Sequence, residues 1–428
     1  MVTVDAPGGF RAGLRRTARD PRIWILLALY VVLLGTNAGF SQDPTDDAID
    51  YHRIAAAAPG LPAQPIGSAY TARFATHYAV GLLHWATGLS LEVAYAVAFA
   101  AVLAALFATV HILFRTLAVG DYAFAAALFV LNPYVLRPYE LQTETLQDLV
   151  FVLGVGICLI GLRDRSSRAV LVGLVIAVLG RQTAIAVAPV VAVWVLLDAR
   201  WRSPARGRRA WPTAILAVAL TLAIFVEVRL WSARFSLPFE PTGVDDTVFN
   251  LFGALPGTAA ELAAHFARIV VPLAVPLTAL VTLVVVVGWR KVSFAGWGAL
   301  LMAAAITVQP AITDPRFPGF AFNEQRLAAL AILPLAVAVA TLLAQTQWRW
   351  PERFARMVSV ALVVVVAVAS LHHEFSSVGP STLTQFLATQ AVAAAVVAVL
   401  LGLGRRSAPV GAAAAPQSLT EATPGGRR

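Results

Sequence analysis

Charged residues are scarce in this chain: they make up 13% of its 428 residues, while 59% are hydrophobic. A soluble domain carries roughly 25% charged residues. Apolar runs long enough to cross a bilayer as helices, roughly 20 residues, recur from one end of the chain to the other. The composition therefore excludes an ordinary soluble domain and predicts an all-α, polytopic helical membrane protein.

Nucleotide-binding motifs are also missing. The sequence contains neither a Walker sequence nor a GxGxxG fingerprint, the glycine-rich loops that cradle phosphates and dinucleotides. We therefore do not expect the protein to use ATP or a sugar nucleotide. Cysteine is nearly absent too, because the single Cys158 lies inside an apolar run and has no partner for an intrachain disulfide.

Lysine is represented only by Lys291, so the net charge of +9 comes from arginine. The arginines form short clusters between apolar runs rather than one basic face, and nucleic acid is therefore not an expected partner. Besides the N-terminal cluster, they occupy alternate loops at 163–168, 200–209, 290–291 and 349–356. The positive-inside rule predicts that this side, with both termini, is cytoplasmic and that the protein lies in the cytoplasmic membrane.

The apolar runs and this alternation predict about twelve spans. The domain 23–403 holds them, between a cytoplasmic segment 1–22 and a tail 404–428 rich in Ala, Pro, Gly and Ser that we expect to be disordered. We expect the first run to be retained as a span, because it is long for a signal peptide and no A-x-A site precedes the loop. Segment 67–88 is predicted to form an amphipathic helix in the interface plane of the first outer loop. The predicted spans are 23–40, 91–114, 119–135, 147–163, 167–180, 183–199, 211–230, 269–289, 295–311, 326–344, 357–372 and 382–403.

Acidic residues crowd the segment after the first span, although the chain has only 23 in all. Asp43 and the proline after it are typical of a helix start, and Asp46 at the third position favours the same start. Capping leaves Asp47 and Asp50 unexplained, and they share a helix face with Tyr51. A carboxylate there can accept a proton from a hydroxyl as a general base, and a pair can hold a divalent cation.

Arginines also occur on the side opposite the basic loops. Arg181, between two apolar runs, indicates either an anionic ligand or an ion pair with Glu227 or another acid of that side, because a buried arginine needs a partner. Arg326 begins a later span in the same way, and arginine grips phosphate oxygens with two parallel hydrogen bonds. Arg137 lies in a polar segment whose acids either line a site or cap the next helix. His372, in a His-His-Glu sequence, is predicted to bind substrate at the rim rather than metal, since no third ligand follows from the spacing.

These segments resemble the GT-C superfamily, polytopic membrane glycosyltransferases that use polyprenyl-phosphate sugars. The pattern DxxxYxxIA that begins at Asp47 resembles their first outer loop, where many members have Asp-Glu and this chain has Asp46 and Asp47. The segments SAYTARFATHY, GRQTAI and NEQRL are similar to segments of a bacterial subgroup. They contain Arg73, Arg181 and Arg326, and Gln182 replaces an acid.

The resemblance implies transfer of a sugar from polyprenyl phosphate to an acceptor hydroxyl, with inversion, at the extracytoplasmic face. Asp47 would act as base or orient the acceptor, with Asp50 beside it, while Arg181 and Arg326 would hold the lipid phosphate. Phosphate is a good leaving group, so no cofactor is required. Whether a divalent cation takes part is left open. The expected partners are the donor, a glycan or lipid acceptor and membrane lipids. The other substrate-binding candidates are Tyr51, Arg73, Arg137, Gln182, Glu324 and His372.

Three alternatives remain open from the sequence. A transporter or flippase for a lipid-linked glycan would also carry outer arginines, but polar residues deep in both halves and internal repeats are typical of one. A polysaccharide polymerase or ligase usually has one dominant outer loop, and loop 231–268 is only moderate in length. The third alternative is a scaffold without catalytic activity.

Overall fold

The computed structural model describes residues 20–37, 46–137, 146–198, 207–237, 259–312, 321–371 and 383–408. Within these ranges the chain is largely helical, as predicted. The elements, in chain order, are α2 (Pro21–Gly35), α3 (Asp46–Ala57), α4 (Ser68–Thr71), α5 (Phe74–Thr87), α6 (Leu91–Phe114), α7 (Val119–Val130), α9 (Gln147–Asp164), α10 (Ser167–Gly180), α11 (Ala184–Leu197), α12 (Gly207–Ser232), α14 (Ala259–Val270), η2 (Val271–Leu273), α15 (Ala274–Val287), η3 (Trp289–Lys291), α16 (Phe294–Ile312), α17 (Ala321–Ala329), α18 (Ile332–Leu343), β1 (Thr346–Trp348), α19 (Glu352–Leu371), α20 (Leu383–Gly404) and β2 (Arg405–Ser407).

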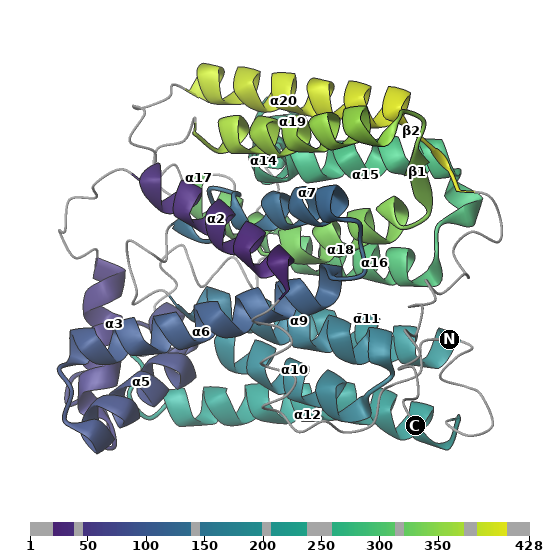
Figure 1. The fold of residues 1–428 in the computed structure, drawn as a ribbon. Coiled ribbons are helices and arrows are strands. Elements are labelled where there is room, and N and C mark those ends of the chain that lie inside the picture. The colour runs from purple at the N-terminus through teal and green to yellow at the C-terminus, as the bar shows by residue number, and fades with distance from the viewer. Residues whose placement is uncertain are drawn as a thin grey trace, which may run out of the picture.

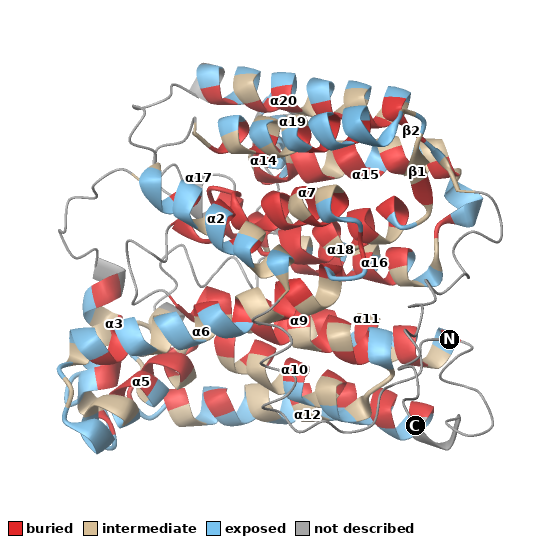
Figure 2. Cartoon of the chain, in the orientation of Figure 1, coloured by how far each residue is buried: buried red, intermediate tan, exposed pale blue. Residues whose placement is uncertain are grey.

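The helices lie in two groups (Figure 1). The first group contains α6 and α9 to α12, with α3 and α5 at one end, and the second contains α2, α7 and α14 to α20. The groups meet along a seam where α11 packs on α16 and α9 on α18. Buried residues concentrate between the helices, and the outer helix faces carry most of the exposed ones (Figure 2). Many of those exposed residues are large and apolar, as expected of faces that meet lipid.

Among the described residues, seven helices are long and apolar enough to cross a membrane. This confirms the prediction of a largely helical protein with several candidate membrane-spanning helices. Four further apolar helices, α2, α7, α10 and α11, are shorter than these seven. The count of twelve spans and the interfacial position of segment 67–88, which contains α4 and α5, stay predictions. The seven are Leu91–Phe114, Ala210–Ser232, His265–Val287, Phe294–Ala311, Gln325–Leu343, Glu352–Leu371 and Gln385–Gly404.

Turns rich in arginine gather at one end of the bundle. Arg22, at the start of α2, donates to the carbonyl of Arg115, and Arg163, at the end of α9, donates to the carbonyl of Ile112. We call this end the basic end and the other the site end. The basic end comprises residues 20–22, 112–121, 163–168, 286–293, 345–353 and 404–408.

The start of the predicted tail belongs to the folded domain, which corrects the predicted boundary at 404. Residues 405–407 form β2, which pairs antiparallel with β1 so that Trp348 faces Arg405. The physical reason is an ion pair, because Arg405 is buried and its guanidinium donates to the carboxylate of Asp121 in the first turn of α7. Residues 409–428 lie outside the described residues.

Glycines bring the backbones of α9 and α10 into contact. A Cβ on Gly180 would lie 2.5 Å from the amide nitrogen of Phe151, and one on Gly154 would lie 2.3 Å from the backbone of α10. Small residues at a helix crossing permit this approach in membranes. Because Gly180 ends α10 beside the first turn of α9, the next residue, Arg181, comes to lie next to Asp148.

Candidate functional site

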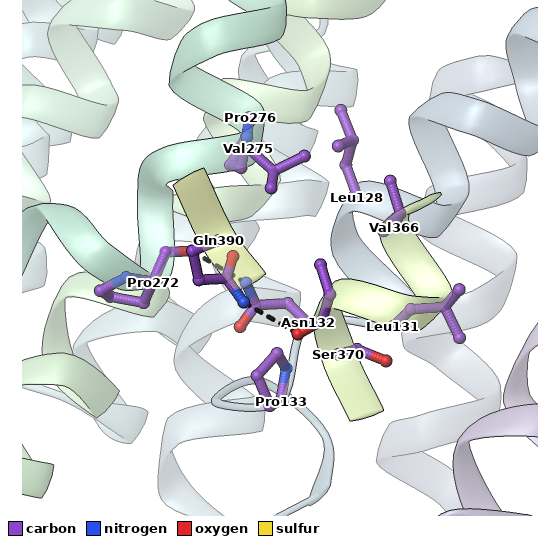
Figure 3. Close-up of a pocket in the computed structure, with 11 residues that line it drawn as sticks. Leu128, Leu131, Asn132, Pro133, Pro272, Val275, Pro276, Val366, Ser370 and Gln390 are labelled. Carbon is purple, nitrogen blue, oxygen red and sulfur yellow. Dashed lines mark hydrogen bonds between the residues drawn. The ribbon is translucent and has the colours of Figure 1, made fainter. Parts of the chain in front are cut away.

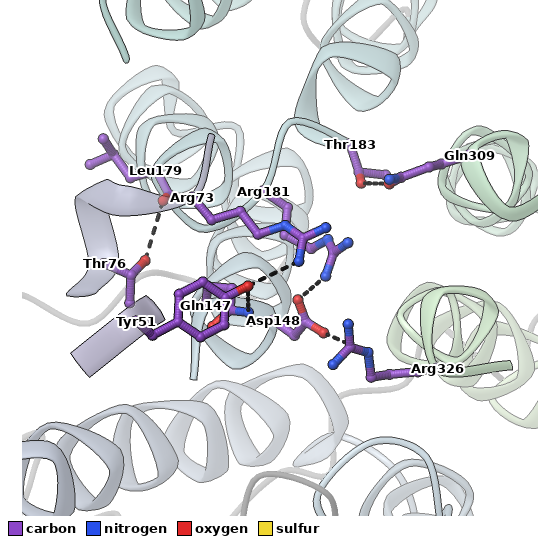
Figure 4. Close-up of polar contacts among 10 residues, drawn as sticks. All are labelled: Tyr51, Arg73, Thr76, Gln147, Asp148, Leu179, Arg181, Thr183, Gln309 and Arg326. Atoms are coloured by element: carbon purple, nitrogen blue, oxygen red, sulfur yellow. Dashed lines mark hydrogen bonds and ion pairs between the residues drawn. The ribbon is translucent and has the colours of Figure 1, made fainter. Parts of the chain in front are cut away.

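Tyr51 connects α3 to the rest of the site end. Its ring is fully buried, and its hydroxyl accepts hydrogen bonds from Nη1 of Arg73 at 3.0 Å and from Nε2 of Gln147 at 3.2 Å (Figure 4). The ring also stacks on His77, with centroids 4.0 Å apart and planes 11° from parallel. The phenol therefore fixes α3 against the turn before α5 and the first turn of α9.

The carboxylate of Asp148, the next residue of α9, interacts with two arginines. Nη1 of Arg181 donates to its Oδ1, and Nε of Arg326 lies 3.6 Å from its Oδ2 (Figure 4). Arg181 follows α10 in the first helix group, whereas Arg326 belongs to α17 in the second. The carboxylate therefore joins the two groups across the seam. We call Asp148, Arg181 and Arg326, together with Arg73, the arginine cluster.

Two arginines of the arginine cluster, Arg181 and Arg326, share the carboxylate of Asp148. Arg181 is 2% exposed, and its Nη2 is buried without a hydrogen-bond partner among the described residues. The charges of Arg73 and Arg326 act unfavourably on that of Arg181. Because a buried donor without an acceptor is costly, the cluster is suited to bind an anion whose oxygen supplies the acceptor that Arg181 Nη2 lacks among the described residues.

Neutral hydrogen bonds hold the elements that carry the arginines. The hydroxyl of Thr183, two residues after Arg181, donates to the amide oxygen of Gln309 on α16 (Figure 4). The hydroxyl of Tyr134 donates to the amide oxygen of Gln325, the residue before Arg326. The two arginines are therefore presented from fixed positions, which is what selective binding of an anion needs.

His77 supports the cluster without sharing its charge. Burial lowers the pKa of His77, on α5, to about 3, so the imidazole is neutral at physiological pH. Its Nδ1 lies 3.0 Å from the hydroxyl of Tyr95, which donates to the main-chain carbonyl of Tyr51 at 3.3 Å. The ring therefore packs Tyr51 in place and adds no further positive charge near Arg73.

Four of the predicted site residues lie along one chain of contacts at the site end. Tyr51, Arg73, Arg181 and Arg326 converge on Gln147 and Asp148, and Gln182, half-buried, occupies the turn between α10 and α11. That list combines residues from both helix groups. Arg181 and Arg326 thus meet at Asp148, and their role in binding, together with Asp47, stays a prediction.

The predicted carboxylates are placed less fully. Asp50 lies on α3 and accepts a hydrogen bond from Nη1 of Arg53 at 3.2 Å. Asp47 belongs to α3, but its side chain lies outside the described residues, as does that of Glu324 on α17. His372 falls outside them altogether. Whether Asp47 reaches the arginine cluster therefore stays a prediction.

Arg137 is fully buried and fastens helix ends of the second group. Its Nη1 donates to the carbonyl of Ser370 at 2.7 Å, at the end of α19, and its Nη2 to the hydroxyl of Thr36 at 2.6 Å, after α2. In this structure its contacts are those of a structural residue. They tie α2, α7 and α19 together at the site end.

A small cavity lies beside Arg137's contacts (Figure 3). Its volume is about 20 Å³, enough for a water molecule but not for a sugar or a phosphate. The amide of Asn132 donates to the carbonyl of Pro272 at 2.9 Å, and that of Gln390 to the carbonyl of Ala369 at 2.8 Å. These amides satisfy carbonyls at helix ends, so the cavity is part of the packing between α7, α15, α19 and α20.

Sequence reasoning missed the central position of Asp148. Of the two alternatives for Arg181, the ion pair with an acid of the same side is confirmed, and the acid is Asp148; Glu227 is instead exposed on α12. A signal for the pair was present. A turn of only two residues joins α9 to α10, so the two helices form an antiparallel pair. In such a pair the first turn of α9 lies close to the residue that follows the end of α10.

The described residues contain no group of three or more His, Cys, Asp or Glu side chains placed to hold a metal ion. The divalent cation considered for Asp47 and Asp50 therefore stays a prediction. Comparisons with family models, with curated proteins and with solved structures found no match for the chain. The arginine cluster is the feature from which a function can be proposed.

Proposed function

We propose that the protein transfers a sugar from a polyprenyl-phosphate donor to an acceptor hydroxyl, as the resemblance to the GT-C superfamily implies. The observation that carries this proposal is the convergence of Arg181 and Arg326 on one carboxylate. Two buried guanidinium groups with a spare donor match the several acceptor oxygens of a phosphate. By the positive-inside rule the basic end is cytoplasmic and the site end extracytoplasmic.

The reaction follows from this placement. The acceptor oxygen forms a bond to the anomeric carbon on one face as the bond from that carbon to the phosphate oxygen breaks on the other. The electron pair of the broken bond stays on the phosphate, where Arg181 and Arg326 stabilise the negative charge. Asp47 takes the proton of the acceptor hydroxyl as a general base. Tyr51 holds α3, and with it Asp47, relative to Arg73.

The second candidate is a transporter for a lipid-linked glycan. Asp148 links the two helix groups, and contacts across such a seam are the kind that open and close in alternating access. A transporter would bind the same donor at the arginine cluster and leave the sugar-phosphate bond intact. The two candidates therefore share the binding site and differ in the fate of one covalent bond.

The test uses membranes that contain the full-length protein and a panel of radiolabelled polyprenyl-phosphate sugars. We expect one donor to be consumed with release of polyprenyl phosphate, and Asp47→Asn to lower the rate by about 10²-fold or more, the contribution of a general base. Arg356→Gln is the matched control, because Arg356 forms an exposed pair with Glu352 at the basic end. An unchanged rate in Asp47→Asn removes Asp47 as the base. Donor binding without bond cleavage for every sugar favours the transporter.

A further inference from the structure

A second cavity lies on the same seam, toward the basic end. Its volume is about 290 Å³, close to the lower bound for ligand pockets, roughly 300 Å³. Both helix groups contribute to it, through the second half of α11 and the first half of α16, and the side chains are apolar or aromatic. The lining residues are Pro189, Val190, Val193, Trp194, Leu197, Phe294, Trp297, Gly298 and Leu301.

The wall of this cavity is closely fitted around Trp194. The indole ring lies against the backbone of α16, since a Cβ on Gly298 would be 2.2 Å from the ring. The ring of Phe294 meets it edge to face, with centroids 6.1 Å apart and planes 85° from parallel. A side chain at position 298 would displace the indole, so the sequence of α16 is adapted to hold Trp194 here.

The same tryptophan has an unsatisfied donor. Trp194 is 5% exposed, and its Nε1 is buried without a hydrogen-bond partner among the described residues. Buried indole N–H groups usually find an acceptor, and a buried donor left unpaired is destabilising. A residue that lines this otherwise apolar cavity therefore carries a donor that the described residues leave unsatisfied.

Positive charge precedes α16 at the basic end. The short helix η3 carries Arg290 and Lys291, both exposed, one turn before Phe294 of the cavity wall. The guanidinium of Arg290 lies over the ring of Trp289, 5.3 Å from its centroid. Basic residues at a membrane surface attract acidic lipids electrostatically. The cavity therefore combines an apolar body, a single buried donor and a basic segment next to it in the chain.

We propose that this cavity binds one acyl chain of an anionic glycerophospholipid from the leaflet at the basic end. The chain lies between α11 and α16, an ester carbonyl accepts the hydrogen of Trp194 Nε1, and the phosphate faces Arg290 and Lys291. The site is separate from the arginine cluster, because the 11 residues from Thr183 to Trp194 span roughly 17 Å of helix. It does not depend on the proposed transfer reaction.

The experiment uses the full-length protein in detergent, titrated with phosphatidylglycerol whose acyl chains are brominated, and separately with brominated phosphatidylcholine. Bromine quenches the fluorescence of nearby tryptophans. The difference in emission between wild type and Trp194→Phe isolates the signal of Trp194. We expect saturable quenching of this signal, with half-saturation at a concentration at least fivefold lower for phosphatidylglycerol than for phosphatidylcholine.

Two variants keep the proposal falsifiable if Trp194→Phe does not fold. The double change Arg290→Gln with Lys291→Gln should remove the preference for phosphatidylglycerol, and Val193→Phe, which fills the cavity, should weaken binding at least fivefold in total emission. Trp24→Phe is the matched control, because Trp24 is an exposed tryptophan near the start of α2 that does not line the cavity. Its isolated signal should respond alike to both lipids. Equal quenching of Trp194 by both lipids, or a preference that survives loss of both basic residues, overturns the proposal.

Discussion

Two buried arginine sites lie at opposite ends of the bundle and differ in how many arginines contact one carboxylate. At the basic end, Arg405 donates to both carboxylate oxygens of Asp121 and lies 3.8 Å above the ring of Trp348. At the site end, Arg181 and Arg326 of the arginine cluster share the carboxylate of Asp148. The comparison shows that burial of an arginine does not by itself indicate a binding site. The difference is that Arg405 contacts its own aspartate, whereas Arg181 and Arg326 contact the same one.

The two sites also differ in how they are enclosed. Gly404 allows the rings of Trp348 and Trp350 to pack against the end of α20, since a Cβ there would lie 2.7 Å and 2.6 Å from them. These rings and the pairing of β1 with β2 close the Arg405 site. The arginine cluster instead lies where α9, α10 and α17 meet across the seam. We therefore expect the Arg405 site to control stability and the arginine cluster to control ligand binding.

The largest effect on stability is expected from Asp121→Asn. The change leaves Arg405 as a buried charge without its partner, which costs about 3–5 kcal/mol in the free energy of unfolding. Denaturant or thermal unfolding of the purified protein in one detergent measures the loss. Asp164→Asn is the matched control, because Asp164 forms an exposed pair with Arg163 and should change stability by less than about 1 kcal/mol. A loss below that value in Asp121→Asn would contradict the structural role of the pair.

Asp148→Asn should also destabilise the protein, but in a way that an anion reverses. The change removes the carboxylate that Arg181 and Arg326 share, and inorganic phosphate or pyrophosphate can take its place. At a hundredfold excess over its dissociation constant, a bound anion adds about 2.7 kcal/mol. Unfolding midpoints measured with and without the anion test this recovery, with matched ionic strength from chloride. Equal recovery of Asp121→Asn would show a general salt effect and contradict the distinction between the two sites.

Arg326→Gln should weaken donor binding more than it weakens the fold. Asp148 keeps its hydrogen bond with Arg181, so the expected loss of stability is about 1 kcal/mol or less. Loss of a charge-assisted contact to phosphate should raise the KM for the lipid donor about 10- to 100-fold, which corresponds to about 1.4–2.7 kcal/mol. Arg405→Gln provides the contrast, with lower stability and unchanged KM in the fraction that remains folded. The same KM in wild type and Arg326→Gln would remove Arg326 from the phosphate site.

The smallest expected effect is on the pH dependence of stability, and it arises from His77 at the site end. The pKa of His77 is about 3 in the folded protein and near 6.5 in an unfolded chain. The unfolded chain therefore binds more protons between these values, and stability falls as pH decreases from 6.5 toward 3. The slope from this group is at most about 1.4 kcal/mol per pH unit. Unfolding at pH 7 and pH 5 should show a smaller difference in His77→Phe than in wild type, while Asp164→Asn should behave as wild type. An identical difference in both variants contradicts the role of His77.

The sequence predicted much of the site end but not its connections. The segment between two apolar runs marked Arg181, and the start of a later span marked Arg326, because a cation in such a position needs a partner. Tyr51 was expected on the same face as Asp47, and its contact with Arg73 was not expected. That contact joins two segments separated by a proline-containing turn, 22 residues apart. No local pattern encodes the direction in which such a turn returns the chain.

Hydropathy and the distribution of arginine were enough to determine a helical protein embedded in a membrane and the order of its apolar segments. Both follow from local composition, which can be read from any stretch of sequence as long as a helix. Only the tertiary structure decided which acid each buried arginine meets, since Arg181 and Asp148 are 33 residues apart and Arg405 and Asp121 are 284 apart. It also placed Trp194 of α11 against Gly298 of α16. The partners of a buried charge and the shape of a cavity depend on side chains from several elements, and they are set only when those elements pack together.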